Sequence, residues 1–562
     1  MDVFDAVVVG SGFGGSVTAF RLAEADMRVC LLERGKPFPP GSFPRSPHDA
    51  AKNFWEPDSQ LYGMYDMWSF SKLDALVSSG LGGGSLIYAN VMIRKPESWF
   101  VHESFDGGYE DWPVTRADLD PHYDRVETMM GAQRYPFGVK PYQDTPKTIA
   151  MQEAASRLGL PWELPLLAVS FGDPPVPGAP IEGGEDNLHH SPRYTCRLVG
   201  ECDLGCNFGS KNSLDFTYLS AANRRGVDIR TLCEVRSFER VKEGFLVSYI
   251  EHGAAGDGDP LAPPARRTVR TRQLILSAGT LGTAYLLLRN RSAFPALSPA
   301  LGTHFSGNGD FLGLVFKARE RRQDGTGATA PRMMEPSFGP VITSAMVMNR
   351  KADGETVRGF YIEDAGYPEF LNWLVEDNVL TMSNRVARFL LRRGWSQLTR
   401  TARSRVGRQL GDAMGKGLFT ATSLPLLGMG RDVPNGRLFL RDGLLDLDWH
   451  LAASDQYFDQ MNEAMERVSH SLGGRYASNP LWWLNRLITV HPVGGAPMGR
   501  TAREGVVDPF GRVYGCPGLS IADGSVMPGP VGPNPSLTIA ALADRSADRI
   551  IEDHRKNPTR PS

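Results

Sequence analysis

A glycine motif close to the N-terminus constrains the fold of this chain more than any other feature. The apolar run Ala6–Val9 predicts a buried β-strand, which leads into Gly10-x-Gly12-x-x-Gly15 and then into an apolar helix over residues 16–25. This order of strand, glycine turn and helix is typical of a dinucleotide-binding unit. Gly10 permits a tight turn, Gly12 lets the backbone approach a pyrophosphate, and Gly15 lets the helix pack close to the strand. The phosphates would lie at the helix N-terminus, where free N–H groups attract negative charge.

An acidic residue ends the next predicted strand. Residues 28–32 form a second apolar run, and Glu33 follows it directly. A carboxylate about 20 residues after the glycines stands where it can bind an adenosine ribose. This stretch alone leaves both NAD and FAD open as the bound dinucleotide.

Length and charge limit the remaining function classes. With 562 residues the chain has room for more than one domain. Its 61 Lys and Arg residues nearly balance its 63 Asp and Glu residues, so we expect no nucleic acid partner. We find neither a secretory leader before the first strand nor an apolar run of about 18 residues, and we therefore expect a cytoplasmic protein.

Three of the six cysteines, Cys196, Cys202 and Cys206, form a cluster, and His189 and His190 lie just upstream as further candidate metal ligands. The spacing matches neither zinc-binding cysteine pairs nor a ferredoxin run. We therefore expect no metal, and interpret the cluster as a tight loop with buried thiols or one disulfide.

Two further glycine-containing junctions bear on the ligand and on the domain organisation. Gly82-Gly83-Gly84-Ser85 lies between apolar residues, which is typical of backbone pressed against a flat or phosphorylated group rather than of a polar linker. A predicted strand over residues 267–276 meets Ser277-Ala278-Gly279 and then an apolar helix over residues 284–289. This late junction predicts that the nucleotide domain is assembled from non-adjacent pieces.

Other elements follow from periodicity. Helices are predicted over residues 119–130, with Thr115 or Asp118 as the cap, and over residues 212–225. Residues 371–408 mix leucines with arginines and predict a pair of amphipathic helices. A solvated cationic face over an apolar stripe is the simpler interpretation. The alternative is a peripheral membrane contact through residues 371–410, where a greasy substrate would enter.

The C-terminal part holds a candidate catalytic pair. His491 precedes Pro492 and two glycines, and Asn534 lies in a proline-rich loop before a helix predicted over residues 536–551. A single histidine is more often structural than catalytic. Oxidation of an alcohol, however, needs a group that takes the hydroxyl proton while hydride leaves the carbon, and a neutral imidazole suits that task. An uncharged amide such as Asn534 can orient the oxygen.

The motifs, in their order along the chain, resemble those of glucose–methanol–choline (GMC) flavoprotein oxidoreductases, and are most similar to the bacterial cholesterol-oxidase-like branch. Further motifs that carry the resemblance are Asp111-Trp112-Pro113, Lys211–Asp215 and Asp523-Gly524-Ser525. The resemblance implies an α/β fold with a Rossmann-like FAD-binding domain and an α+β substrate domain built on a mainly antiparallel sheet. The implied FAD-binding domain comprises residues 1–98, 195–312 and 485–562, and the substrate-binding domain comprises residues 99–194 and 313–484.

The resemblance selects FAD over NAD. Because residues 76–100 contain no histidine for attachment, we expect the FAD to be non-covalent. Carried over residue by residue, the implied cofactor-binding set is Gly10, Gly12, Phe13, Gly14, Gly15, Glu33, Arg34, Gly83, Gly84, Ser85, Asn90, Val235, Ala278, Gly279, Asp523, Gly524 and Asn534.

The resemblance also implies the catalytic residues. They are His491 and Asn534, with Glu363 as the best positional match for a substrate-domain glutamate that either handles a second proton or shapes the pocket. The expected reaction is oxidation of a hydrophobic alcohol (sterol-like, long-chain or aryl) by hydride transfer to flavin N5, with O2 or another electron acceptor. The alternative is a GMC-fold lyase or light-driven decarboxylase that uses FAD without net oxidation.

Overall fold

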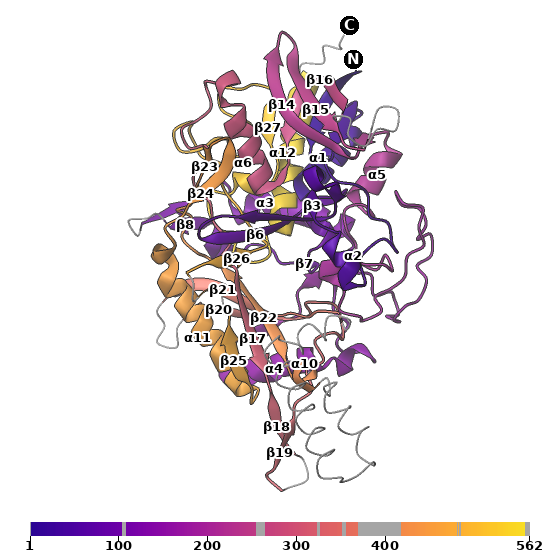
Figure 1. Cartoon of the computed structure of the whole chain (residues 1–562), viewed down its shortest axis with the longest axis vertical. Helices are drawn as coiled ribbons and strands as arrows, with labels where there is room; N and C mark the ends of the chain where they lie inside the picture. Colours follow the sequence, from indigo (N-terminus) through magenta and orange to yellow (C-terminus); the bar gives the residue numbers. More distant parts are fainter. Residues whose placement is uncertain are drawn as a thin grey trace, which may run out of the picture.

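Figure 1 shows the computed structural model of the 562-residue chain. The structure describes residues 2–103, 108–253, 265–322, 326–350, 356–368, 418–479, 482 and 485–556. The amphipathic pair expected over residues 371–410 lies outside the described residues. No helix in the described ranges is long and apolar enough to cross a membrane.

A seven-stranded sheet occupies the upper part of Figure 1. Its strands run in the order β13-β2-β1-β16-β15-β14, and β27 also pairs with β16. The strands are β1 (Asp2–Val9), β2 (Val29–Leu32), β13 (Asp228–Arg230), β14 (Cys233–Val241), β15 (Gly244–Glu251), β16 (Ala265–Leu276) and β27 (Leu519–Ile521). β13, β2, β1, β16 and β27 are parallel, and the apolar runs Ala6–Val9 and Val29–Leu32 and the apolar end of β16 are buried because both faces of the sheet are covered there.

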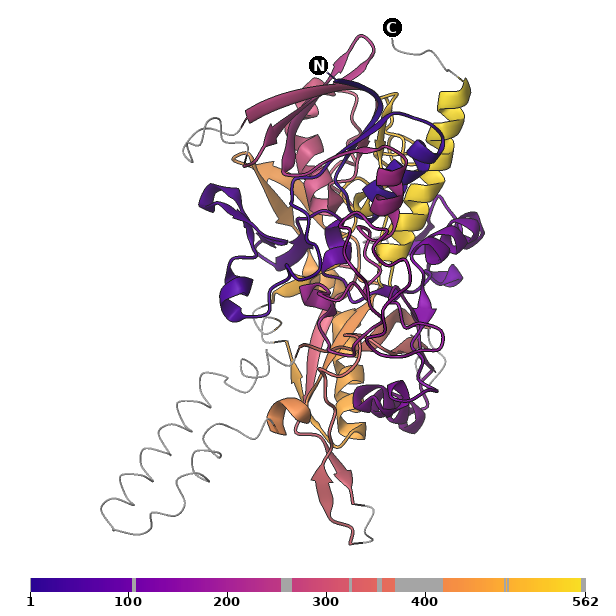
Figure 2. The ribbon, with the colours of Figure 1, turned by 90° about the vertical axis from the view of Figure 1, so that its right-hand side faces the viewer.

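Helices cover this sheet, and a long C-terminal helix joins several of them. They are α1 (Phe13–Glu24), α3 (Arg116–Met129), α5 (Tyr218–Arg224), α6 (Gly279–Arg289) and α12 (Ser536–Lys556). Figure 2 shows α12 along one side of the molecule, where it packs against α1 and α3. Buried Asp544 of α12 forms ion pairs with Arg21 of α1 and Arg125 of α3 and lies 2.7 Å from the His122 ring of α3, so one carboxylate ties the three helices together.

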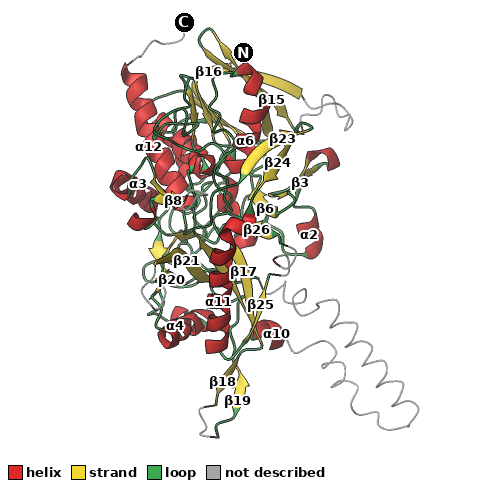
Figure 3. Ribbon diagram, turned by 90° about the vertical axis from the view of Figure 1, so that its left-hand side faces the viewer, coloured by secondary structure: helices red, strands yellow, loops and turns green. Residues whose placement is uncertain are grey.

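A six-stranded antiparallel sheet forms the lower part of the molecule. Its order is β11 (Trp162–Glu163), β20 (Ala345–Arg350), β21 (Thr356–Asp364), β22 (Leu424–Gly430), β17 (Phe311–Phe316) and β25 (Arg475–Ser478). Helices α4 (Pro146–Leu158) and α11 (Asp455–Ser471) pack beside it (Figure 3). The prediction of a Rossmann-like part plus a mainly antiparallel sheet is confirmed.

Short elements complete the described chain. The remaining helices are α2 (Pro47–Ala51) and α10 (Leu418–Ala421). The remaining strands are β3 (Trp55–Glu56), β4 (Leu61–Tyr62), β5 (Tyr65–Ser69), β6 (Leu73–Ser78), β7 (Val91–Met92), β8 (Val101–Glu103), β9 (Tyr109–Asp111), β10 (Gln133–Arg134), β12 (Leu166–Leu167), β18 (Arg319–Arg321), β19 (Thr329–Pro331), β23 (Arg437–Arg441), β24 (Leu444–Asp448) and β26 (Leu487–Thr489).

Helix boundaries show where local signals suffice and where tertiary contacts override them. Thr115 caps α3 through a capping box with Asp118, as its sequence predicts. The helix predicted over residues 212–225 begins only at Tyr218. Residues before it make other bonds: Asn212 Nδ2 donates to the Met130 carbonyl, and the Leu214 amide donates to Ser85 Oγ. These contacts hold the segment out of a helix.

Candidate active site

Close packing explains several glycines of the N-terminal motif. Gly10 adopts a φ of 97°, which favours glycine. A Cβ added to Gly15 would lie 1.9 Å from the Gly10 carbonyl oxygen, and one added to Gly14 would lie 1.4 Å from the Ala522 carbonyl oxygen. α1 therefore contacts both the turn after β1 and the end of β27 at distances that only glycine allows.

Three other glycines border open space instead. A Cβ at Gly12, Gly84 or Gly279 would meet no protein atom within 4 Å. Gly12 is the N-cap residue of α1 and Gly279 begins α6, so two helix N-termini face this space. The two glycine loops touch, since a Cβ on Gly83 would lie 2.6 Å from Gly12 Cα. Open glycines at two helix N-termini fit a diphosphate.

Glu33 stands at the end of β2 and is buried. Its Oε2 accepts from Ser11 N at 2.9 Å and Ser11 Oγ at 2.6 Å, and its Oε1 accepts from Gly35 N at 2.8 Å. The carboxylate thus anchors the glycine turn, a role that sequence reasoning missed, and it keeps acceptor capacity for a ribose. Val235 lies nearby on β14, because the Cys233 amide donates to the Glu33 carbonyl at 2.8 Å.

Asp523 follows β27 and binds the start of α6. Its Oδ2 accepts from Gly279 N at 3.0 Å and Thr283 Oγ1 at 2.5 Å, and its Oδ1 accepts from Ser525 N at 2.9 Å. Burial raises the pKa of Asp523. The next residue, Gly524, is also tightly packed, since a Cβ there would lie 2.8 Å from Thr280 Oγ1.

Several other predicted cofactor residues use their side chains in contacts within the protein. Ser85 Oγ donates to the Gly82 carbonyl at 2.7 Å and accepts from Leu214 N, so its hydroxyl is engaged by the protein. Arg34 pairs with Asp66 at 2.6 Å. Phe13 packs edge-on against Tyr88, and Ala278 is the N-cap residue of α6.

Asn90 differs from these residues because its buried amide group has no partner in the described part of the protein. It is fully buried with a φ of 70°, and neither its amide nitrogen nor its amide oxygen has a partner among the described residues. A buried amide without partners is costly, so such a group points to a polar ligand.

His491 is bound to an aspartate that sequence reasoning missed. Its Nδ1 lies 2.8 Å from Asp310 Oδ1, and Asp310 is 3% exposed. In the described part of the chain no residue is hydrogen-bonded to His491 Nε2. The available signal for Asp310 was the polar, glycine-rich run Ser306-Gly307-Asn308-Gly309-Asp310 directly before the apolar strand β17.

Asn534 and Glu363 are brought into direct contact from distant parts of the chain. Asn534 Nδ2 donates to Glu363 Oε2 at 3.3 Å, and both side chains are buried. Asn534 Oδ1 and Glu363 Oε1 have no partner among the residues described. Glu363 lies on β21 opposite Ala345 and Leu427, and burial raises its pKa to about 8. The pair therefore presents two unpaired oxygens, which a substrate or cofactor can bind.

The loop that carries Asn534 is held by a buried cation and by an aromatic ring. Lys95 Nζ donates to the carbonyls of Pro530 and Val531 at 2.8 and 2.9 Å. The Trp99 ring packs against Gly532, where a Cβ would lie 2.3 Å from the ring. These contacts fix the backbone that leads to Asn534.

All six cysteines are free thiols, so the disulfide alternative is wrong. Cys196 is buried and Cys202 is half-buried, and burial raises the pKa of both thiols. Lys211 lies beside them, donates to the carbonyls of Leu86 and Cys202, and has its pKa lowered to about 8 by burial. His189 pairs with Asp215 at 2.7 Å.

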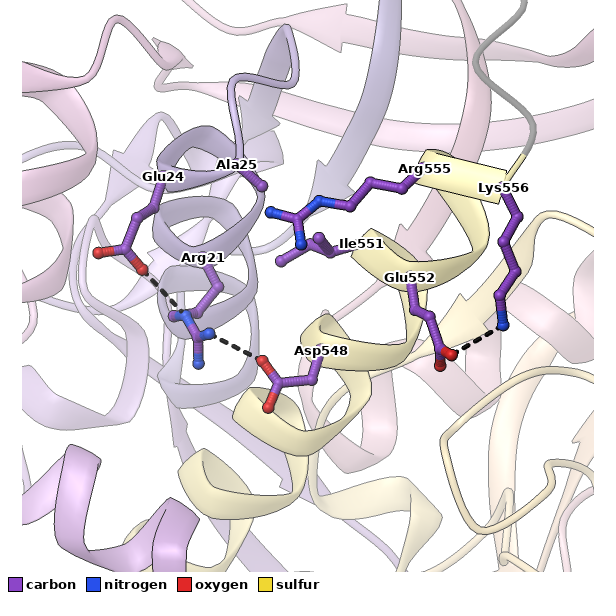
Figure 4. Close-up of a pocket in the computed structure, with 8 residues that line it drawn as sticks. All are labelled: Arg21, Glu24, Ala25, Asp548, Ile551, Glu552, Arg555 and Lys556. Atoms are coloured by element: carbon purple, nitrogen blue, oxygen red, sulfur yellow. Dashed lines mark hydrogen bonds and ion pairs between the residues drawn. The ribbon is translucent and has the colours of Figure 1, made fainter.

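A surface cavity of about 490 Å³ between α1 and α12 lies apart from these residues (Figure 4). Most of its charged side chains pair with one another: Arg21 with Glu24 and Asp548, and Lys556 with Glu552. The neighbouring group His122, Asp544 and Asp548 has metal-ligand spacing, but arginines already neutralise both carboxylates.

Comparison with known proteins identifies the family of the chain. Residues 183–306 and 446–543 match the two models of the GMC oxidoreductase family, and residues 8–41 match an NAD(P)-binding Rossmann-like domain. The chain is 30% identical over 560 residues to a cholesterol oxidase of Mycobacterium tuberculosis, covering 97% of this chain and 90% of the relative. It is 24% identical to a long-chain-alcohol oxidase of Arabidopsis thaliana, covering 99% and 68% of the two chains. The crystal structure of pyridoxine 4-oxidase from Mesorbium loti shares the fold, with a TM-score of 0.58, 17% identity and coverage of 97% and 98%.

Proposed function

The chain belongs to the GMC oxidoreductase family of FAD-dependent enzymes that act on alcohols, and from this premise we propose that it oxidises a hydrophobic alcohol to the carbonyl compound. The observation that carries the proposal is the site itself. Among the described residues nothing is hydrogen-bonded to His491 Nε2, and the Asn534–Glu363 pair has two buried oxygens without a partner there.

The residues present fit FAD. Gly12, Gly84 and Gly279 leave room for a diphosphate beside two helix N-termini, and Asn90 offers an unpaired buried amide. Glu33 and the backbone of Val235 would hold the adenosine half. When bound, FAD supplies the acceptor for the hydride that leaves the alcohol carbon.

In this proposal the protein residues manage the hydroxyl proton and the orientation of the alcohol. His491 Nε2 accepts the hydroxyl proton as the C–H bond breaks, because a neutral imidazole is an effective base near pH 7. Asn534 hydrogen-bonds the reacting oxygen and adds no charge.

Glu363 is neutral in most molecules at pH 7, since its pKa is about 8. Its Oε2 accepts from Asn534, and its Oε1 has no partner in the described part of the chain, so a proton on Oε1 can donate to a ligand. The pocket-shape interpretation of Glu363 uses this neutral form, whereas the interpretation in which it takes up a second proton requires the ionised form.

Two relatives support the substrate class and the acceptor. A cholesterol oxidase and a long-chain-alcohol oxidase match over nearly the whole chain, and both names denote large apolar alcohols and oxidase activity. We infer a hydrophobic alcohol as substrate and O2 as the electron acceptor.

We also propose the domain division expected from the sequence, because each of the two sheets falls almost entirely within one of the two expected domains. The seven-stranded sheet falls within residues 1–98, 195–312 and 485–562, whereas the six-stranded sheet falls within residues 99–194 and 313–484 except for the start of β17.

An anaerobic substrate screen tests the proposed function. Holoenzyme is mixed in the dark with sterols, long-chain alcohols, aryl alcohols and sugars while the flavin absorbance is followed. Bleaching by the apolar alcohols and not by sugars is the expected result. Bleaching by sugars alone would contradict the substrate class, and product formed without bleaching would favour a non-oxidative use of FAD. Admission of air separates the acceptors, because an oxidase regains its flavin absorbance rapidly in O2.

A further inference from the structure

A five-residue segment, Ser306–Asp310, is hydrogen-bonded both to His491 and to the backbone just before Asn534. We call it the positioning loop. Buried Asp432 holds its start, because Asp432 Oδ1 accepts from Ser306 Oγ at 2.5 Å and Oδ2 accepts from Gly307 N at 3.3 Å. Tyr457 donates to the Gly309 carbonyl at 3.0 Å. The loop is therefore fixed independently of the residues that it contacts at the site.

Asp310 lies at the end of the positioning loop, and both of its carboxylate oxygens have hydrogen-bond partners. Oδ2 accepts from Thr489 Oγ1 at 2.8 Å, from Val490 N at 2.9 Å and from His491 N at 3.2 Å. Oδ1 lies 2.8 Å from His491 Nδ1. An ionised carboxylate accepts only, so the short contact with Nδ1 requires that this nitrogen carry the proton. In the neutral imidazole, Nε2 is then the unprotonated atom.

Asn308, two residues earlier, binds the backbone before Asn534. Its Nδ2 donates to the carbonyls of Gly532 and Pro533 at 3.3 and 3.2 Å, and its Oδ1 accepts from Gly532 N at 2.9 Å. Because Asn308 is fully buried, these bonds are not exchanged with water.

We propose that Asp310 is the positioning residue of His491: it holds the proton on Nδ1 and so reserves Nε2 as the atom that accepts the alcohol proton. Asn308 of the same loop holds the backbone just before Asn534. One loop therefore fixes the positions of both His491 and Asn534 relative to each other. This inference rests on the proposed function, since it assigns how His491 is prepared for that reaction.

The substitution Asp310→Asn makes a specific prediction. Two backbone N–H groups, those of Val490 and His491, face Oδ2, so the amide oxygen of the new residue must take that position. Its NH2 group then points at His491 Nδ1 and donates to it. The proton of the neutral imidazole moves to Nε2, and Nε2 can no longer act as the base. We expect kcat to fall by about 100-fold or more, the lower range for loss of general base catalysis, with a much smaller change in KM.

The matched control is Asp432→Asn, which makes the same chemical change at the other end of the positioning loop. Asp432 is fully buried, does not contact His491, and has its pKa raised to about 7 by burial, so a neutral amide resembles its protonated form. We expect this variant to keep the His491 tautomer of wild type, because the bonds between Asp310 and His491 are left in place.

The test is nitrogen NMR of holoenzyme labelled with 15N-histidine, with His491 assigned by the signal lost in His491→Gln. The expected result is Nδ1–H in wild type and in Asp432→Asn, and Nε2–H in Asp310→Asn. Nε2–H in wild type would overturn the proposal even if Asp310→Asn did not fold. An unchanged tautomer in Asp310→Asn, or the same change in Asp432→Asn, would also overturn it. The NMR result stands apart from the proposed function, which fails instead if no alcohol bleaches the flavin of wild type.

Discussion

Replacement of Glu363 by glutamine should change how the stability of the protein depends on pH. Burial raises the pKa of Glu363 from 4.5 to about 8 in the folded chain, so between these values the folded chain binds a proton that the unfolded chain releases. Stability contributed by this group is therefore complete below pH 4.5 and is lost as the pH rises to about 8. Glutamine is neutral at every pH and retains an oxygen to accept from Asn534.

The size of the effect follows from linkage. Each pH unit in that interval costs about 1.4 kcal/mol, so the total is about 5 kcal/mol for this fully buried group. With an unfolding entropy of about 2.1 cal/mol/K per residue, cooperative unfolding of the chain converts this into about 4 °C in Tm. We expect Glu363→Gln and wild type to melt together near pH 5, and the variant to melt about 4 °C higher at pH 8.5.

Differential scanning calorimetry of the two holoenzymes at a fixed excess of FAD measures this difference. The matched control is Glu466→Gln, because Glu466 is half exposed on α11 and the same substitution there should leave the Tm difference flat with pH. A Tm difference between Glu363→Gln and wild type that does not change from pH 5 to pH 8.5 would refute the reasoning that Glu363 is buried as a neutral acid.

Three further predictions concern the cofactor and the base. His491→Ala should keep its FAD and lose about 100-fold to 10,000-fold in alcohol turnover. The control His470→Ala, at an exposed histidine, should turn over alcohol as wild type does. Near-normal turnover of His491→Ala would show that His491 is not the catalytic base. Gly12→Ala should fold and yet bind FAD poorly, because its Cβ meets no protein atom within 4 Å and enters the space proposed for the diphosphate. Gly138→Ala, whose Cβ also meets open space, should bind FAD normally. Spectra of the two purified variants decide this, and full FAD content in Gly12→Ala would place the diphosphate elsewhere. Heat or acid should release intact FAD into the supernatant, and flavin that stays with the denatured chain would show a covalent link.

Local patterns in the sequence were enough to predict the elements around the glycine motif. The apolar run before Gly10 and the run ending at Glu33 are strands β1 and β2, and the junction at Gly279 does begin a helix. Such features depend on backbone sterics and on continuous burial, and both are determined by residues that are adjacent in the sequence. The contact of Glu363 with Asn534 agrees with their assignment to one site, which came from the family resemblance.

Contacts between distant residues could not be read in the same way. Asp310 lies 181 positions from His491, and Asn308 lies 224 positions from Gly532, so no periodic pattern marks either pair. Ser85 is an example of a different kind. Its place in a glycine loop indicates contact with a ligand, but in the structure its hydroxyl accepts from the Leu214 amide. In each case a buried hydrogen bond between separate elements determines the role of the side chain.

Stopped-flow reduction of the flavin tests the central claim most directly. Wild type is mixed anaerobically in the dark with a bleaching alcohol and with the same alcohol deuterated at the carbinol carbon. If hydride leaves that carbon as His491 takes the hydroxyl proton, the flavin bleaches with both alcohols and more slowly with the deuterated one, and His491→Ala bleaches far more slowly than either. Equal bleaching rates in wild type and His491→Ala, or carbonyl product without flavin reduction, would contradict the account.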